Sequence, residues 1–153
     1  KGSIIKFPKI SVGATENSII AACLAKGKTV LKNCAIEPEI KDLTNFLNSA
    51  GAKIRWFGRT CKILGTNSLS QTEYTVMADR IEAGTFCVAA TLTMGNLEIK
   101  DFNSSIIRTE LELLKKVGAK IKTSESKILI KGPEKIKSIK NRFIYKVQKK
   151  LKI

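Results

Sequence analysis

EIKDLTNFLNSAGAKI, residues 39–54, is similar to a stretch 67 positions later, IIRTELELLKKVGAKI, residues 106–121. The two stretches share the string GAKI, and each carries apolar residues at helical spacing before it. A second match lies upstream, where the Ala-Ala pair at residues 21–22 corresponds to residues 89–90, and Gly27 to Gly95, at an offset of 68. A shared string and an aligned pair at nearly one period indicate an internal repeat.

Each repeat predicts the same series of elements: an apolar helix, a strand, an amphipathic helix and two further strands. The predicted helices span residues 16–25, 38–49, 80–93 and 105–117, and the predicted strands span residues 29–32, 53–57, 61–64, 96–100, 120–123 and 127–130. Turn residues separate these segments, and Gly51 and Gly118 stand where a helix-ending glycine is expected. The predicted fold class is therefore α/β.

The two helices of a repeat differ in the distribution of their apolar residues. In helix 38–49 these residues form one stripe, whereas residues 19–24 are apolar without interruption and go right round the helix axis. A helix that is apolar on every side must be enclosed by other elements. This pattern predicts helices inside and sheets outside, with the extended residues 73–77 as the passage from one domain to the next.

The composition excludes several kinds of site. With 43% hydrophobic residues the chain can build a core, and with no histidine it has no His-based triad, zinc site or general base. The four cysteines form neither a CxxC pair nor a usual zinc spacing, so we expect no metal, no cofactor and a reduced, cytoplasmic setting. No apolar run approaches the roughly 18 residues that span a bilayer, so we expect no membrane partner.

The net charge of +15 is unevenly distributed along the chain. Residues 135–153 hold eight basic residues and no acidic ones. The modest positive balance of the remainder suits an enzyme of phosphorylated substrates as well as it suits RNA binding. The basic residues are not interleaved with aromatic residues on which bases could stack. A non-catalytic, basic nucleic-acid-binding module is therefore the alternative and not the main interpretation.

A short polar stretch with one glycine, SVGAT at residues 11–15, precedes the first apolar helix. It allows two interpretations. The stretch could be a turn that ends a strand and caps the helix through Ser or Thr, or its backbone N–H groups could bind an anion. Taken alone, the residues favour the cap.

Three motifs carry a family resemblance: SVGATEN at residues 11–17, EPEIKDL at 37–43 and DRIEAGTF at 79–86. In this order and spacing they resemble the UDP-N-acetylglucosamine enolpyruvyl transferases, bacterial enzymes of the first committed step of peptidoglycan synthesis. The resemblance covers about residues 1–140. The shikimate-pathway enolpyruvyl transferases share the repeat but not these strings, so they are the weaker match.

The resemblance implies a fold and a domain division. Members of this family are built from repeated βαβαββ units, three per domain, in an inside-out α/β barrel with buried helices. Residues 1–76 would then belong to the first, nucleotide-sugar-binding domain and residues 77–138 to the second. The sequence departs from the family after Ser138, so residues 139–153 form a divergent basic tail.

The resemblance also implies a reaction. The family transfers the enolpyruvyl group of phosphoenolpyruvate to the 3′-hydroxyl of UDP-N-acetylglucosamine and releases phosphate. It places Lys9, Ile10, Ser11, Val12 and Gly13 in the nucleotide-sugar site. Physical chemistry supports this placement, because a helix N-terminus attracts anions and a glycine lets a phosphate approach the backbone. With the resemblance, the anion interpretation of residues 11–15 is preferred.

The resemblance implies supporting roles in the active site for two carboxylates. Glu37 would lie on the cleft side and order cationic groups that bind phosphate, and Asp79 would face the active site from the hinge between domains. Both residues also begin a helix: Pro38 occupies a favoured first-turn position, and Asp79 with Glu82 forms a capping-box pattern.

Several parts of the family's machinery have no counterpart in the chain. The general-acid cysteine lies on a loop that would precede Lys1, so no catalytic residue is assigned within the sequence. The N-terminal Lys-Asn pair, the later aspartate base and the last arginine are missing as well. We therefore expect a fragment that is inactive alone and that has the remainder of the enzyme as a candidate partner.

Overall fold

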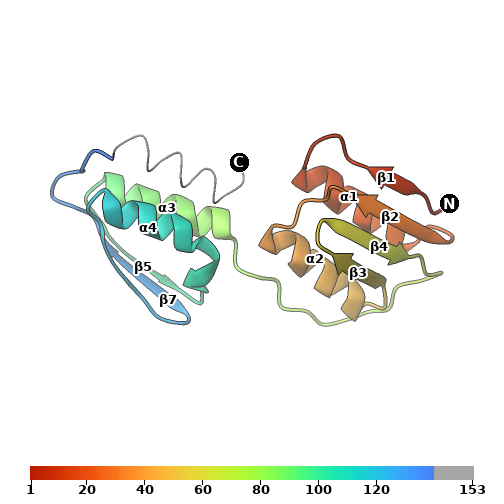
Figure 1. Cartoon of the computed structure of the whole chain (residues 1–153). Helices are drawn as coiled ribbons and strands as arrows, with labels where there is room; N and C mark the ends of the chain where they lie inside the picture. The colour runs from red at the N-terminus through yellow and green to blue at the C-terminus, as the bar shows by residue number, and fades with distance from the viewer. Residues whose placement is uncertain (140–153) are drawn as a thin grey trace. The chain divides into compact units, whose positions relative to one another are not determined.

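Figure 1 shows the protein as a computed structural model that describes residues 1–139. The basic tail predicted from the sequence lies outside the described residues from position 140 onwards. The chain divides into two compact units, Lys1–Met77 and Ala78–Ile153. Each unit has its own sheet and its own core, and each is described by itself.

The first unit has the element order βαβαββ. Its elements are β1 (Ile4–Lys6), α1 (Val12–Cys23), β2 (Lys28–Lys32), α2 (Pro38–Ser49), β3 (Lys53–Phe57) and β4 (Thr60–Leu64). They form a sheet in the order β1-β2-β4-β3, in which β1 runs parallel to β2 and the other pairs are antiparallel. The sequence prediction missed β1, whose three residues are all exposed and show no alternation.

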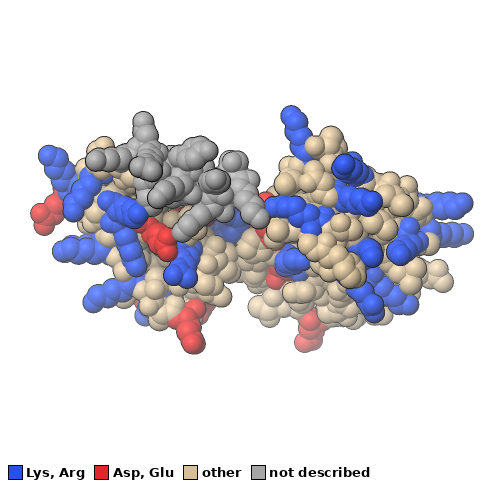
Figure 2. Space-filling view, in the orientation of Figure 1, with Lys and Arg blue, Asp and Glu red and all other residues tan. Residues whose placement is uncertain are grey.

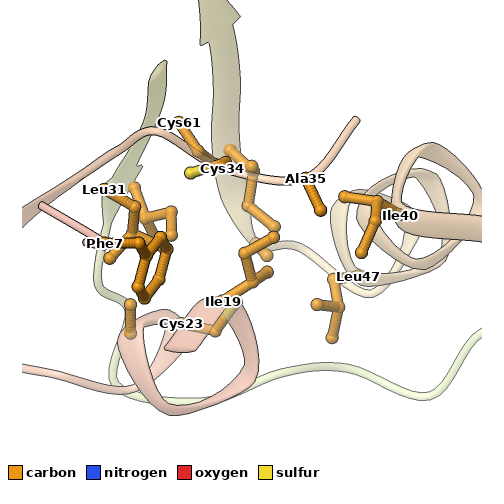
Figure 3. Packing of buried hydrophobic residues seen from close by; sticks show 13 residues of the cluster. Phe7, Ile19, Cys23, Leu31, Cys34, Ala35, Ile40, Leu47 and Cys61 are labelled. Atoms are coloured by element: carbon orange, nitrogen blue, oxygen red, sulfur yellow. The ribbon is translucent and has the colours of Figure 1, made fainter. Parts of the chain in front are cut away.

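The core of the first unit lies between one face of this sheet and the helices α1 and α2. Alternate strand residues such as Leu31 and Ile63 point into it, as the period of two in a strand requires. Figure 3 shows Phe7 and Leu31 at one side of the cluster and Ile40 and Leu47 of α2 at the other, with Ile19 between them. The opposite face of the sheet is not covered by any helix of the unit.

The second unit begins with a helix and repeats the same order. Its elements are α3 (Arg80–Leu92), β5 (Asn96–Lys100), the 3-10 turn η1 (Ser104–Ile107), α4 (Arg108–Lys116), β6 (Lys120–Thr123) and β7 (Lys127–Lys131). The antiparallel sheet has the order β5-β7-β6. A separate apolar cluster, which includes Cys87, Phe102 and Ile128, fills the space between sheet and helices.

The repeat seen in the sequence is confirmed by equivalent hydrogen bonds where α2 and α4 end. Gly51 and Gly118 both adopt the left-handed conformation, with φ of +98° and +112°. The N–H of Ala52 donates to Leu47 at 2.9 Å, and the N–H of Ala119 donates to Leu114 at 3.0 Å. This is the helix-ending geometry for which glycine is favoured. The string GAKI therefore marks the same structural feature in both repeats.

Two predicted helix boundaries are wrong. The helix predicted over residues 16–25 begins at Val12, so residues 11–15 are not an open turn but an N-cap followed by helix. The helix predicted over residues 105–117 is divided into η1 and α4. The Asn103 side chain accepts a hydrogen bond from the Ser105 N–H at 3.0 Å, which favours a tighter first turn.

The apolar helices are enclosed on one side only within their own units. On α1, Ile19 and Cys23 are buried, but Ile20 is 51% and Leu24 is 56% exposed. On α3, Cys87 is buried, but Phe86 is 54% and Leu92 is 59% exposed. The complete enclosure predicted from the sequence is therefore not present in either unit. No helix within residues 1–139 has both the length and the apolar character needed to cross a membrane.

Candidate functional site

The candidate site lies where the connections β1–α1 and β2–α2 leave the sheet. Because β1 and β2 are adjacent and parallel, with Ile4 opposite Val30 and Lys6 opposite Lys32, both strands end at the same edge. Residues 9–13 follow the first strand, and Glu37 follows the second. The structure thus brings together two of the predicted site segments, at the carboxyl ends of strands where α/β sheets commonly bind ligands.

Hydrogen bonds hold the two connections against each other. The Asn33 side-chain amide donates to the carbonyl of Phe7 at 2.9 Å. The Thr15 hydroxyl donates to the carbonyl of Ser11 at 2.7 Å and accepts from the N–H of Ala35 at 3.0 Å. Thr15 and Ala35 are completely buried. The start of α1 is therefore fixed to the β2–α2 connection through a single hydroxyl group.

Removing that hydroxyl is expected to destabilise the first unit. Thr15→Val keeps the shape of the side chain but leaves the buried N–H of Ala35 without an acceptor, at a cost of about 1–3 kcal/mol. Thr15→Ser is the matched control, because it keeps the hydroxyl and loses one methyl group, which costs about 1 kcal/mol. Urea unfolding followed by Trp56 fluorescence measures both. The interpretation fails if Thr15→Val is no less stable than Thr15→Ser.

The first turn of α1 leaves backbone donors available. Ser11 is the N-cap, and its hydroxyl accepts from the N–H of Ala14 at 3.2 Å. Within residues 1–139, the N–H groups of Val12 and Gly13 have no acceptor. The first turn carries no acidic residue that could compensate the positive end of the helix dipole. The Ser cap and the free N–H groups coexist, so the two interpretations of SVGAT do not exclude each other.

Gly13 is not required by the fold. Its φ is not positive, and a Cβ added to it would meet no atom within 4 Å. The glycine therefore relieves neither a strained backbone nor a crowded contact in this unit. What its lack of a side chain does provide is open access to the N–H groups of Val12 and Gly13. This observation favours the anion interpretation over a purely structural turn.

One basic side chain precedes these donors, and a second reaches the neighbouring connection. Lys9 and Ile10 are exposed, and Lys9 forms no ion pair with a residue of the described chain. Arg59, from the turn between β3 and β4, reaches the β2–α2 connection and donates from Nη1 to the carbonyl of Cys34 at 2.9 Å. Sequence reasoning treated Arg59 only as a turn residue. No local signal marks this contact, because it joins residues 25 positions apart.

Glu37 has a backbone partner of its own. Its Oε2 accepts from the N–H of Ile36 at 2.7 Å, and its side chain makes no capping bond to α2, where Pro38 occupies the first position. The carboxylate is therefore held at the start of α2, at the same sheet edge as Lys9. Among residues 1–139 no cation contacts this carboxylate, so a role in ordering phosphate-binding groups stays a prediction.

Asp79 lies in the second unit, at the N-terminus of α3. Its Oδ1 accepts from the N–H groups of Ile81 at 2.7 Å and Glu82 at 3.1 Å. The predicted capping role is confirmed by these two bonds. The hinge role implied by the family resemblance stays a prediction, since the contacts described for this side chain are those of its own helix.

The cysteines are unsuited to acid–base work in contact with a substrate. All four are buried thiols. Burial raises the pKa of Cys61 to about 12 and that of Cys87 to about 11, and it also raises the pKa values of Cys23 and Cys34. Within residues 1–139, no three His, Cys, Asp or Glu side chains are grouped so that they could hold a metal ion.

Comparison with known proteins gives consistent matches over most of the chain. The sequence model of the family described as EPSP synthase (3-phosphoshikimate 1-carboxyvinyltransferase) matches residues 1–147. The UDP-N-acetylglucosamine 1-carboxyvinyltransferase of Pelagibacter ubique (strain HTCC1062) is 61% identical over 127 residues, which are 82% of this chain and 30% of that protein. The enzyme of the same name from Coxiella burnetii (strain Dugway 5J108-111) is 45% identical over 82% of this chain and 29% of its own length.

Solved structures agree on the fold. The enolpyruvyl transferase NikO from Streptomyces tendae has a TM-score of 0.69 at 22% identity, over 80% of this chain and 30% of that chain. The EPSP synthase from Acinetobacter baumannii has a TM-score of 0.63 at 21% identity, over 91% of this chain and 33% of that chain. The chain thus spans about a third of the length of the proteins it matches.

Proposed function

The chain belongs to the EPSP synthase (3-phosphoshikimate 1-carboxyvinyltransferase) family, and we propose that it forms part of a UDP-N-acetylglucosamine 1-carboxyvinyltransferase. The observation that carries this proposal is the 61% identity over 127 residues to a protein of that name. The proposed reaction transfers the enolpyruvyl group of phosphoenolpyruvate to the 3′-hydroxyl of UDP-N-acetylglucosamine and releases phosphate. The proposed setting is the bacterial cytoplasm, in peptidoglycan synthesis. Nothing in these matches favours a nucleic-acid-binding module.

Within this function, the nucleotide sugar binds at the carboxyl ends of β1 and β2 in the first sheet. Lys9 supplies one full charge, and the free N–H groups of Val12 and Gly13 supply two backbone donors at the positive end of α1. The exposed Ile10 and the Ser11 cap lie between them in the chain. An anionic diphosphate is the part of the substrate that this donor set fits best. Thr15 and Asn33 act as positioning residues, because their hydrogen bonds hold the two connections together, and Arg59 fixes the β2–α2 connection to the turn between β3 and β4.

The two carboxylates take supporting roles. Glu37, held by the Ile36 N–H at the same sheet edge, would orient cationic groups around a phosphate. Asp79 would act from the start of α3, where its capping bonds fix the carboxylate. Phosphoenolpyruvate is the proposed second substrate. These roles rest on the family resemblance, and the hydrogen bonds explain how each carboxylate is kept in place.

The proposed architecture of the whole enzyme is the inside-out barrel. Residues 1–76 would form part of the first barrel domain and residues 77–138 part of the second. The exposed apolar side chains on α1 and α3 support this, since a helix with apolar residues on its free side needs further neighbours. Other repeats of the enzyme would supply them.

Titration of the ¹⁵N-labelled chain with UDP-N-acetylglucosamine tests the proposed function. We expect the largest chemical-shift changes at the amides of Val12 and Gly13, because their N–H groups would gain an acceptor. N-Acetylglucosamine without the diphosphate is the control and should leave these amides unchanged. The proposal fails if millimolar nucleotide sugar moves no amide at this sheet edge.

The isolated chain is expected to release no phosphate from phosphoenolpyruvate and UDP-N-acetylglucosamine. General acid catalysis contributes about 10²–10⁴-fold to such reactions, and the four cysteines are buried with raised pKa values. A coupled phosphate assay on the purified chain, with the Coxiella enzyme as positive control, measures this. Phosphate release at a rate near that of the control would contradict the expectation.

A further inference from the structure

The outward face of the first sheet gathers basic side chains. Its strand residues alternate with the buried ones, and residues paired in register share a face. Figure 2 shows Lys and Arg side chains collected over the strands of this unit. We define the basic face as the six Lys and Arg residues that point away from the helices: Lys6, Lys28, Lys32, Lys53, Arg55 and Lys62.

The arrangement of this face is electrostatically unfavourable for the protein alone. Lys6 lies directly opposite Lys32, and Lys62 lies directly opposite Arg55. No acidic residue stands among them on these strands, and none of the six forms an ion pair within residues 1–139. Like charges directly opposite each other on neighbouring strands destabilise a sheet. An anionic partner would relieve this repulsion.

The second unit repeats the pattern. On the outward face of its sheet, Lys120 lies opposite Lys131 and Lys100 lies opposite Lys127. The one acidic residue there is Glu98, whose carboxylate contacts Lys127 Nζ at 2.6 Å. Residues 1–139 hold 22 basic and 13 acidic residues. With Lys122 of β6, the two outward faces hold eleven basic residues and one acidic residue, which accounts for all of that net positive charge.

Protection of sheet edges could account for Lys6, Lys53 and Arg55, which lie on the edge strands β1 and β3, but not for the other three lysines of the basic face. Lysine on an edge strand prevents pairing with another chain, but an inner strand has no free edge to protect. Lys28 and Lys32 lie on β2 and Lys62 lies on β4, and both strands are in the interior of the sheet. The distribution of charge therefore points to an interaction surface.

The apolar residues on the same face distinguish between anionic partners. Ile4 is 70%, Phe57 is 57% and Leu64 is 48% exposed among the lysines. A nucleic-acid surface would offer aromatic rings for base stacking. Here Phe57 is the one ring on this face, so successive bases would find no series of rings, and Lys62 Nζ lies 4.3 Å from its centroid. Exposed apolar tips beside lysines are instead typical of proteins that lie at a bilayer interface.

We propose that the basic face docks on a bilayer rich in anionic phospholipid. The lysines contact the headgroups, and Phe57 and Leu64 reach the boundary with the acyl chains. A hollow of about 730 Å³, lined by residues that include Lys28, Lys53 and Arg55, gives headgroups room on this face. The binding is peripheral and salt-dependent, as expected for exposed charges. It departs from our expectation of no membrane partner, which rested on the absence of a spanning segment.

Co-sedimentation of the full chain with vesicles tests this proposal. We expect binding to vesicles of equal parts phosphatidylglycerol and phosphatidylcholine, and none to phosphatidylcholine alone. K28Q/K53Q/R55Q should weaken binding about 100-fold at low salt, since each basic residue near such a surface contributes about 5-fold. The matched control K26Q/K115Q/K135Q removes three exposed charges that lie outside the strands of both sheets. It should weaken binding less than 10-fold, and both variants keep residues 140–153 unchanged.

Phe57→Ser separates a bilayer from other polyanions. It should weaken vesicle binding several-fold and leave binding to heparin unchanged, because it keeps every charge. Thermal melting shows whether the variants are folded, and K28Q/K53Q/R55Q should melt no lower than the parent since it removes repulsion. The proposal is overturned by absence of binding to phosphatidylglycerol vesicles, or by equal weakening in the two triple variants. Tighter binding to single-stranded RNA than to the vesicles would also overturn it.

Discussion

Raising the pH from 9 to 12 is expected to destabilise the first unit by about 3 kcal/mol through Cys61 alone, because the thiol is half titrated in the unfolded state at pH 9 and in the folded state at pH 12. Burial raises the pKa of this thiol from its ordinary value of 9.0 to about 12, with a smaller contribution from the neighbouring Cys34. Each unit of pKa difference between the folded and unfolded states corresponds to about 1.4 kcal/mol.

The direction follows from proton binding. Above pH 9 the unfolded chain loses the Cys61 proton, whereas the folded unit retains it until about pH 12. The stabilisation is complete below pH 9 and is lost as the pH rises through the folded value, since the unfolded state then binds fewer protons. The pKa values of Cys23 and Cys34 are also raised, so they act in the same direction.

Cys61→Ala provides the measurement. The variant should be less stable than the parent at pH 7, because it leaves a small cavity, but the difference should shrink as the pH rises from 9 to 12. Urea midpoints at each pH, read from Trp56, report on the first unit because the chain has a single tryptophan. Cys87→Ala, in the second unit, is the control and should leave this pH dependence unchanged. Parallel stability curves for Cys61→Ala and the parent would contradict the expectation.

Local sequence signals predicted the helices that end at a glycine and the strands in which buried and exposed residues alternate. Helix α2 and strand β3 match their predicted spans, because Pro38 marks the start of one helix and Gly51 its end. The start of α1 was placed four residues late. Gly13 and two hydroxyl residues resemble a turn in the sequence, but in the structure the Ser11 hydroxyl caps a helix that already includes Gly13.

Features that depend on distant residues could not be predicted in this way. The contact of Arg59 with Cys34, and the double role of the Thr15 hydroxyl, join residues 20 or more positions apart. The sequence did predict that α1 and α3 need apolar neighbours on every side. Which elements provide those neighbours depends on packing beyond the two repeats, so the exposed faces of both helices were not foreseen.

The candidate site was located by its family motif and not by its chemistry. Ser11, Val12 and Gly13 are individually common in caps and turns, and no pattern of spacing separates a cap from an anion site. The structure shows which backbone donors the cap leaves available. The cap uses the N–H of Ala14, while the N–H groups of Val12 and Gly13 have no acceptor among the described residues. Binding measurements on variants of this helix N-terminus can therefore separate the two roles.

Gly13→Val is expected to weaken binding of UDP-N-acetylglucosamine about 10- to 100-fold without loss of folding. A charge-assisted hydrogen bond contributes about 1.5–3 kcal/mol, and the valine side chain would prevent a phosphate from reaching the neighbouring N–H groups. The fold should tolerate the change, because a Cβ at this position meets no atom within 4 Å and the backbone is not left-handed. Ala21→Val, on the exposed part of the same helix two turns on, is the matched control.

Two further substitutions show how the site works. Lys9→Met should weaken binding most at low salt, since it removes an exposed charge and keeps the stem. Ser11→Ala should lower affinity less, and it should also destabilise the unit by about 1 kcal/mol, because it removes the cap of α1. If residues 11–15 serve only the fold, the opposite pattern is expected. Gly13→Val then lowers the melting temperature, and every folded variant binds UDP-N-acetylglucosamine normally. Amide titrations on the folded variants decide between the two, and unchanged affinity in all three would end the anion-site interpretation.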